Sequence, residues 1–144
     1  MIRKADRKDA SVLGELASRL WPHHTAVEME AEMEQLLKLE DTAAFLAFEE
    51  EKAVGFAQCS LRHDYVEGTS GSPVGYLEGI YVTESCRGKG IAKALLNACE
   101  DWARTKGCTE FASDCELDNV ESLCFHMNMG FQEANRIICF AKKL

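Results

Sequence analysis

Proline, positive charge and paired cysteines are scarce in this sequence, and each scarcity argues against a class of protein. Only two of the 144 residues are proline while 47% are hydrophobic, so the composition argues against a disordered chain. The formal net charge of -8 disfavours a nucleic-acid-binding protein, because such proteins are usually basic. The charge is compatible with a cationic substrate, although a solvated acidic surface is the commoner explanation.

The seven cysteines are an odd number and are spread singly, with no Cys-x-x-Cys pair and no zinc-site histidine spacing. They predict free thiols in a reducing cytosol and no metal site. The N-terminal residues lack the apolar core of a signal peptide, and no apolar run approaches membrane-spanning length. We therefore expect a soluble, cytoplasmic protein. Because the chain has no repeat or linker and its length suits a single core, we expect one domain covering residues 1–144.

One stretch organises the chain. Residues 74–82 are apolar, aromatic or glycine except for Glu78, which predicts a buried strand. A short turn and the glycine-rich run Arg87-Gly88-Lys89-Gly90 follow, and apolar residues at helical spacing then predict a helix that starts near Ile91 and stops at Gly107. The glycine-rich loop is thus placed at a helix N-terminus.

A loop of this kind is suited to bind an anion. The first turn of a helix has unpaired N–H groups and the positive end of the helix dipole, and glycines allow a phosphate to approach the backbone. The order of residues fits neither the nucleotide P-loop nor the dinucleotide fingerprint. An ordinary strand-to-helix turn remains the alternative for the loop considered alone.

The remaining elements follow from periodicity and punctuation. A polar, turn-rich segment at residues 62–73 is too long for a tight hairpin and predicts a functional loop. Asp118 and Glu121 predict a capping box for a helix that Gly130 closes. The other expected elements are strands at residues 2–5, 42–48, 53–61 and 109–114, a helix capped by Asp6 or Asp9 that ends before Trp21, a helix at about 26–39, and two short strands after Phe131, the last at 137–141.

This order of elements, together with Arg87-x-x-Gly90-x-Ala92 after a strand and Met127-Asn128-Met129-Gly130-Phe131, resembles the GCN5-related N-acetyltransferase superfamily. The resemblance covers essentially the full chain. It implies an α/β (α+β) fold, with a mixed central sheet of about seven strands flanked by four helices. It also implies acetyl-CoA as co-substrate and a homodimer, with the C-terminal strands as a plausible contact.

Several clusters are similar to the short, single-domain aminoglycoside 6'-N-acetyltransferases, which confer antibiotic resistance. They are Trp21-Pro22 with His24, residues 62–66, 72–74 and 77–82, and Phe111-Ala112-Ser113-Asp114. The resemblance implies acetylation of an aminoglycoside 6'-amine by direct attack in a ternary complex, with Trp21, His24 and Tyr65 contacting the acceptor. For the cofactor it implies contacts from Ile80, Val82, Arg87, Gly88, Lys89, Gly90, Ile91, Ala92 and Asn119.

Acetyl transfer requires a neutral amine, and a lysine-like amine with a pKa of about 10.4 is protonated at pH 7. A carboxylate must therefore bind the cation and accept its proton. Glu78 is the first candidate, because a glutamate inside an apolar strand is costly unless it faces a wet cleft, and Gly79 permits a bulge there. Asp114, at the end of the next strand, is the second. Sequence does not assign which of them is the base; the N–H of Ile80 or its neighbour is the candidate donor to the thioester oxygen.

The acid that protonates the departing thiolate is where the chain differs from the superfamily. Many members have a tyrosine four residues before the Gly-Phe glycine, whereas this chain has His126 there and no tyrosine after Tyr81. His126 is a candidate acid, and a structural role is the alternative. Asn119 has a similar alternative, as a residue at the start of a helix.

Two other functions compete with aminoglycoside acetylation. The first is an acetyltransferase for another amine, such as a polyamine or a protein N-terminus. The second is a non-catalytic acyl-CoA-binding module, which the presence of Glu78 and Asp114 disfavours. A nucleophilic cysteine is disfavoured too, because no cysteine has an evident base beside it. The acidic residues of helix 26–39 are most simply a solvated face, or else the rim of a site for a polycation.

Overall fold

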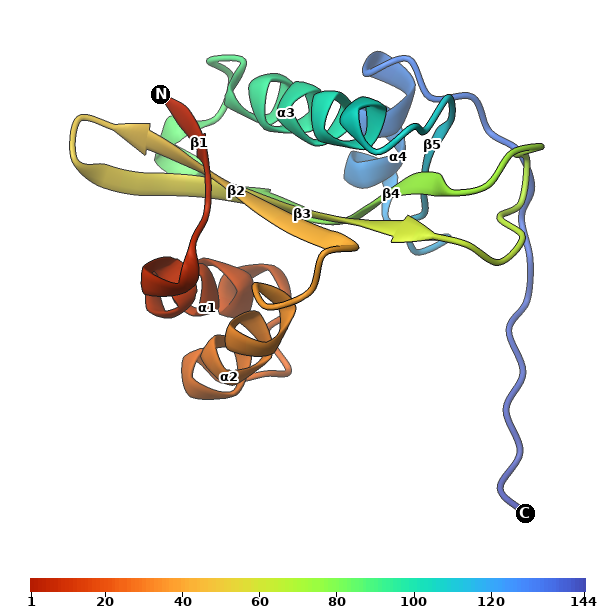
Figure 1. Cartoon of the computed structure of the whole chain (residues 1–144), viewed down its shortest axis with the longest axis horizontal. Coiled ribbons are helices and arrows are strands. Elements are labelled where there is room, and N and C mark those ends of the chain that lie inside the picture. Colours follow the sequence, from red (N-terminus) through yellow and green to blue (C-terminus); the bar gives the residue numbers. More distant parts are fainter.

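The structure is a computed structural model of residues 1–144. A five-stranded sheet in the order β1-β2-β3-β4-β5 crosses the molecule (Figure 1). Its first four strands are antiparallel, and β5 pairs parallel to β4. The mixed α/β fold is confirmed, but the sheet has five strands rather than about seven. The strands are β1 (Ile2–Lys4), β2 (Thr42–Glu49), β3 (Lys52–Arg62), β4 (Val74–Val82) and β5 (Phe111–Ser113).

Four α-helices cover the two faces of the sheet. Helices α1 (Ala10–Leu20) and α2 (Ala26–Leu36) lie on one face, and α3 (Ile91–Thr105) and α4 (Val120–Asn128) lie on the other (Figure 1). Successive side chains of a strand point to opposite faces of the sheet, and in β2 the side chains on both faces are apolar. Ala43, Phe45 and Ala47 join the cluster under α3, whereas Ala44 and Leu46 join the cluster with α1 and α2. None of the helices is long and apolar enough to cross a bilayer.

The ends of the first two helices follow local chemistry. Helix α1 ends at Leu20 as predicted, because Pro22 disfavours helical geometry at Trp21. Helix α2 ends at Leu36 rather than at Leu39, so that prediction was too long. The Thr42 hydroxyl donates to the Leu36 carbonyl at 2.7 Å, and it thereby satisfies a carbonyl at the end of the helix as the chain turns into β2.

Strand β4 has the predicted bounds and contains the predicted bulge. Gln58 pairs with Gly79 and Cys59 pairs with Leu77, so Glu78 is an extra residue on β4. As a result Leu77 and Val82 both pack under α3, although regular alternation would put them on opposite faces. Gly79 also makes room for Trp21, because a Cβ added there would lie 2.6 Å from an indole carbon.

The C-terminal part departs most from the sequence prediction. Strand β5 is shorter than residues 109–114, and the cap of α4 lies one residue later than predicted. The Asn119 side chain, not that of Asp118, accepts the cap bond, from Ser122 N–H at 3.0 Å. The two strands expected after Phe131 are absent, because no strand of this chain lies beside that segment.

Residues 132–144, here called the C-terminal arm, have no regular structure and extend away from the sheet (Figure 1). The arm touches the rest of the chain near its start, where the Asn135 side chain donates to Glu67 at 3.2 Å. Beyond that contact its apolar side chains are exposed, with Ile137 at 71%, Ile138 at 80% and Phe140 at 90%. A continuous run of exposed apolar side chains is unusual for a folded chain.

Candidate active site

The glycine-rich loop lies at the start of α3, as predicted. Gly88 and Gly90 have φ angles of 80° and 81°, in the left-handed region that favours glycine. A Cβ added at either residue would meet nothing within 4 Å, so the loop is open to an approaching ligand. Because Gly90 caps the helix without a side-chain bond, the first-turn N–H groups of Ile91, Ala92 and Lys93 have no partner in the chain. This geometry fits a phosphate.

The two cations of this loop are held by other parts of the chain. The Arg87 Nε donates to the Val82 carbonyl at 2.8 Å, which ties the loop to the end of β4. The Lys89 ammonium lies 2.9 Å from the Glu49 carboxylate at the β2–β3 hairpin. The hydrogen bond from Lys89 lowers the pKa of Glu49, and the same bond raises the pKa of Lys89. Both side chains are exposed, so a phosphate can still approach them.

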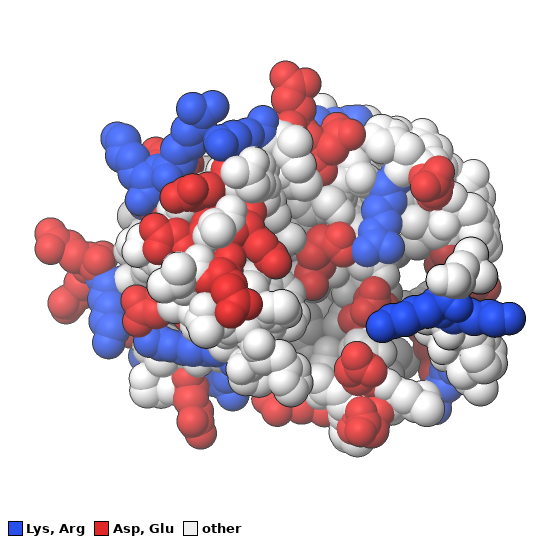
Figure 2. Space-filling view, turned by 90° about the horizontal axis from the view of Figure 1, so that it is seen from below, with Lys and Arg blue, Asp and Glu red and all other residues white.

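A cavity of about 300 Å³ lies on the opposite face of the sheet, between the sheet and α1–α2. Figure 2 shows this face of the molecule hollowed, with acidic side chains around the hollow. The bulge directs Glu78 into the cavity, where the side chain is 24% exposed. The cavity is lined by Trp21, His24, Met29, Glu32, Gln58 and Glu78.

Trp21 and His24, two residues predicted to contact the acceptor, therefore line the same cavity as Glu78. Trp21 packs edge-on against Phe56, with the ring centroids 6.2 Å apart, and it forms one wall of the cavity. The His24 Nδ1 lies 3.3 Å from the Glu28 carboxylate on α2. Glu32 supports the view that the acidic edge of α2 rims a site, because its side chain reaches the cavity.

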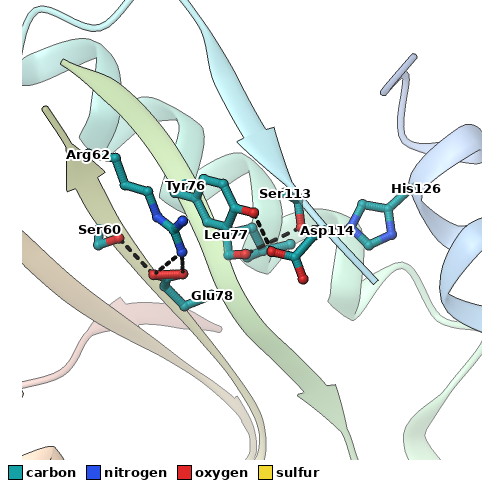
Figure 3. Close-up of polar contacts among 8 residues, drawn as sticks. All are labelled: Ser60, Arg62, Tyr76, Leu77, Glu78, Ser113, Asp114 and His126. Carbon is teal, nitrogen blue, oxygen red and sulfur yellow. Dashed lines mark hydrogen bonds and ion pairs between the residues drawn. The ribbon is translucent and has the colours of Figure 1, made fainter. Parts of the chain in front are cut away.

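Glu78 has two polar partners from β3. Ser60 donates to Glu78 Oε2 at 3.0 Å, and Arg62 Nη2 lies 2.6 Å from Oε1 (Figure 3). The Arg62 guanidinium also stacks on the ring of Tyr76, 3.5 Å from its centroid. Arg62 is therefore paired with Glu78, the carboxylate that the sequence analysis predicts to bind the substrate amine.

Asp114 is joined to the same group through Tyr76. The Tyr76 hydroxyl donates a short hydrogen bond to the Asp114 carboxylate (Figure 3). Burial raises the pKa of Tyr76 well above its ordinary value, and the hydrogen bond to Asp114 raises it further. Tyr76 therefore stays protonated at neutral pH and keeps the hydroxyl proton that it donates to the Asp114 carboxylate. The two predicted carboxylates lie at the ends of one chain of contacts through Arg62 and Tyr76.

Strands β4 and β5 part at this point. Their pairing ends at Leu77 and Ser113, whereas β4 continues to Val82. Successive side chains of a strand point to opposite faces, so Ser113 and Asp114 lie on different sides of the sheet. Asp114 contacts Tyr76 on the cavity side, and Ser113 contacts His126 of α4 on the α3–α4 side.

His126 is held at both ring nitrogens. Its Nδ1 lies 2.7 Å from the Ser122 carbonyl oxygen, and its Nε2 lies 2.7 Å from the Ser113 hydroxyl. Asn119, at the start of the same helix, uses its side-chain oxygen as the cap, and its contact with the cofactor stays a prediction. Its side-chain NH₂ group remains available to a ligand.

The loop at residues 63–73 is anchored by Glu110, next to β5. The Glu110 carboxylate accepts the N–H of Ser70 at 2.9 Å and that of Gly71 at 2.7 Å, and these bonds lower its pKa. Tyr65 on this loop is 77% exposed and does not line the cavity. The structure thus brings Trp21, His24 and Glu78 together and leaves Tyr65 apart from them.

Sequence reasoning missed the partners of the carboxylates. Gln58, Ser60 and Arg62 alternate along β3, and this period of two was the signal that they share a face. Tyr76 precedes Glu78 with the same spacing on β4. No group of three or more metal-binding side chains is present.

Comparisons with known proteins found similar sequences and similar structures. The model of the acetyltransferase (GNAT) family matches residues 12–131. An aminoglycoside N(6')-acetyltransferase type 1 of Acinetobacter haemolyticus is 43% identical over 130 residues, which cover 90% of this chain and 89% of the relative. The protein of the same name from Salmonella typhimurium is 40% identical, covering 99% of this chain and 98% of the relative. A solved structure of AAC(6')-Iy with the bisubstrate analogue CoA-S-monomethyl-acetylneamine superposes with a TM-score of 0.95 at 39% identity, covering 100% of this chain and 98% of that one.

Proposed function

Since the chain belongs to the acetyltransferase (GNAT) family, we propose that it transfers the acetyl group of acetyl-CoA to the 6'-amine of aminoglycosides. Relatives of that name align over nearly their full length, and one similar structure holds CoA joined to an acetylated neamine. The observation that carries the proposal is the bulge in β4, which directs Glu78 into the cavity beside Trp21 and Glu32. Acidic groups in a concave site suit a substrate with several ammonium groups.

We propose that acetyl-CoA binds along the loop from Arg87 to Ala92. The open space at Gly88 and Gly90 and the unpaired N–H groups of α3 support a pyrophosphate there. The exposed guanidinium of Arg87 adds positive charge. Along the parting of the strands, the backbone of Ile80 and Val82 and the side chain of Asn119 would contact the pantetheine arm, and the bound cofactor supplies the reactive thioester.

On the cavity side, we propose that Glu78 and Asp114 bind the substrate amine and accept its proton. Direct attack then needs a neutral amine next to the thioester, at the point where β4 and β5 part. Trp21 and His24 would contact the sugar rings from the cavity wall, and Tyr65 would contact the acceptor from its loop. Glu78 must exchange its Arg62 partner for the substrate ammonium.

The test compares Glu78→Gln and Asp114→Asn with the native protein in an assay of thiol release. Loss of the proton acceptor should lower turnover by about 10²–10⁴-fold, whereas loss of a binding carboxylate should raise mainly the KM for the acceptor. Glu34→Gln is the matched control, because Glu34 lies on α2 outside the cavity. Native kinetics in both site variants would contradict the proposed site.

The choice of acceptor is tested with the native protein. An aminoglycoside with a 6'-amine should be acetylated, while its 6'-hydroxy analogue should not. A polyamine and a peptide with a free N-terminus test the other acetyltransferase function. Acetyl-CoA binding without transfer to any amine would instead support the acyl-CoA-binding module.

We propose that two copies of the chain form a homodimer through the C-terminal arm. The arm exposes Ile137, Ile138 and Phe140, and the sheet ends at β5, whose outer edge has no strand beside it. No residue of α4 is fully buried, so the surface beside this edge is thinly covered. A second copy supplies both an edge for the arm and a cover for these side chains.

The molar mass of the protein, measured by light scattering as it elutes from a size-exclusion column, tests the dimer. The native chain should have twice the monomer mass, and Ile138→Asp should shift it to the monomer. Lys142→Glu, a charge change on the same arm, should leave the dimer intact. A monomeric native chain at micromolar concentration would contradict the proposal.

We also propose a cytoplasmic location, supported by the seven free cysteines.

A further inference from the structure

Ser113 and His126 form a hydrogen-bonded pair that the carboxylate chemistry does not use. Ser113 is the last residue of β5 and lies on the α3–α4 side of the sheet, where the loop of the proposed cofactor site also lies. Its neighbour Asp114 lies on the cavity side (Figure 3). The two consecutive residues therefore present a hydroxyl to one face and a carboxylate to the other, at the point where the strands part.

The bonds of His126 are satisfied in both of its protonation states. A carbonyl oxygen can only accept, so Nδ1 carries a proton that it donates to the Ser122 carbonyl. In the neutral ring, Nε2 accepts the proton of the Ser113 hydroxyl at 2.7 Å. In the protonated ring, Nε2 donates to Ser113 Oγ, and the hydroxyl turns to the Leu77 carbonyl at 3.3 Å. The pair can thus gain or lose one proton without leaving either residue unpaired.

Acetyl transfer needs such a proton on the cofactor side. The departing CoA sulfur leaves as a thiolate, while the amine loses its proton to a carboxylate across the sheet. The chain has no tyrosine after Tyr81 to supply this proton. The Ser113 hydroxyl lies on the α3–α4 side of the sheet, the side of the proposed cofactor loop.

We propose that Ser113 donates its proton to the CoA thiolate and recovers one from protonated His126. In this step the Ser113 O–H bond breaks as the S–H bond forms. The Nε2–H bond of His126 breaks as a new O–H bond forms on Ser113. The net change is imidazolium and thiolate to imidazole and thiol, and water then returns a proton to the partly exposed ring. The inference rests on the proposed acetyl transfer, with Ser113 as the catalytic residue and His126 acting through it.

The first test does not use turnover. We expect the His126 ring proton signal in an NMR spectrum to shift when CoA binds and to shift much less with desulfo-CoA, which lacks the sulfur. Ser113→Ala should abolish the difference between the two ligands. His126→Gln identifies the signal among those of the four histidines. Equal shifts with both ligands in the native protein would overturn the relay, whether or not aminoglycosides are the substrate.

The second test is kinetic. Ser113→Ala and His126→Gln should lower kcat by about 10²-fold with the acceptor KM unchanged. This is the low end of the general-acid range, because a thiol with a pKa of about 8.5 is already a moderate leaving group. Ser113→Thr keeps the hydroxyl and should restore turnover, and Cys124→Ala on the exposed side of α4 is the control.

The two variants also separate the relay from a structural link between β5 and α4. Glutamine at position 126 can keep a hydrogen bond to Ser113 but cannot deliver a proton, so full activity of His126→Gln would overturn the proposal. If Ser113→Ala fails to fold, His126→Gln and the NMR comparison still decide. No acetylation by the native protein, combined with a sulfur-dependent shift, would refute the proposed function and leave the contact with the thiol supported.

Discussion

At the scale of single residues, the least expected feature is the arginine on Glu78. Arg62 is 44% exposed and Glu78 is 24% exposed, so the ion pair is neither buried nor fully solvated. If Glu78 binds the substrate ammonium as proposed, the Arg62 guanidinium lies where that ammonium would bind. Arg62 would then compete with the substrate for the carboxylate.

Arg62→Gln should lower the KM for the acceptor. Because exposed or partly exposed ion pairs contribute about 0–1 kcal/mol, the expected decrease is at most about fivefold. Arg62→Lys is the control, since it keeps the charge and should leave the KM near the native value. Steady-state kinetics with a saturating acyl donor measure both variants. A higher KM in Arg62→Gln would mean that the guanidinium helps to bind the acceptor.

The individual site residues were predictable to different degrees. A carboxylate inside an apolar strand is costly, so Glu78 was identifiable from sequence, and the bulge beside Gly79 was confirmed. The link from Arg62 through Tyr76 to Asp114 could not be predicted from sequence. It depends on the register of β3 against β4 and on the face of the sheet to which each side chain points. Sequence spacing alone does not determine either.

At the scale of elements, both ends of α3 are glycines with similar backbone angles. Gly90 at the start has a φ of 81°, and Gly107 just after the end has a φ of 88°. Nothing lies within 4 Å of a Cβ added at either position, so a side chain causes the same kind of strain at both. Only Gly90 belongs to the loop proposed to bind pyrophosphate.

Gly90→Val should weaken CoA binding by at least about tenfold, because the side chain keeps the phosphate from the backbone N–H groups. Gly107→Val should destabilise the fold to a similar extent, about 1–3 kcal/mol, with CoA affinity unchanged. Calorimetric titration and denaturant unfolding separate the two effects. Equal CoA affinity in the two variants would place the pyrophosphate elsewhere.

Elements that pack within this chain were predicted well, and those that do not were predicted badly. Apolar periodicity located α1, β2, β3, β4 and α3, because each buries a face against the sheet core. The apolar run from Ile137 to Ala141 predicted a strand that the structure lacks. A strand needs a neighbour to pair with, and an apolar run does not say whether that neighbour is in the same chain.

At the scale of the whole molecule, the acidic side chains gather around the hollow in the surface. The chain has a formal net charge of -8, and the hollowed face in Figure 2 has acidic side chains around it. Glu28, Glu32 and Glu78 all lie at or beside the cavity. A field of this sign raises the local concentration of a polycation and speeds its arrival.

The second-order rate constant for the acceptor should therefore fall as salt is added. Screening acts over about 8 Å at physiological ionic strength, so the effect should be clear between about 0.02 and 0.5 M salt. Stopped-flow or steady-state kcat/KM measurements with a tri- or tetra-cationic acceptor provide the test, and an acceptor with one charge is the control. If kcat/KM did not change with salt for either acceptor, the acidic residues would be a solvated surface with no role in attracting the acceptor.

The parting of β4 and β5 affects how ligands can come and go. The strands are joined from Gly75 to Leu77 on β4 and separate after Ser113 on β5, so the hydrogen-bonded ladder has a notch that is closed at one end only. A chain-like molecule lying in a notch can slide out along its open end, whereas one threaded through a hole needs the walls to open. Exchange of CoA for fresh acetyl-CoA therefore requires no strand pair to break, and the sheet can stay rigid throughout the catalytic cycle.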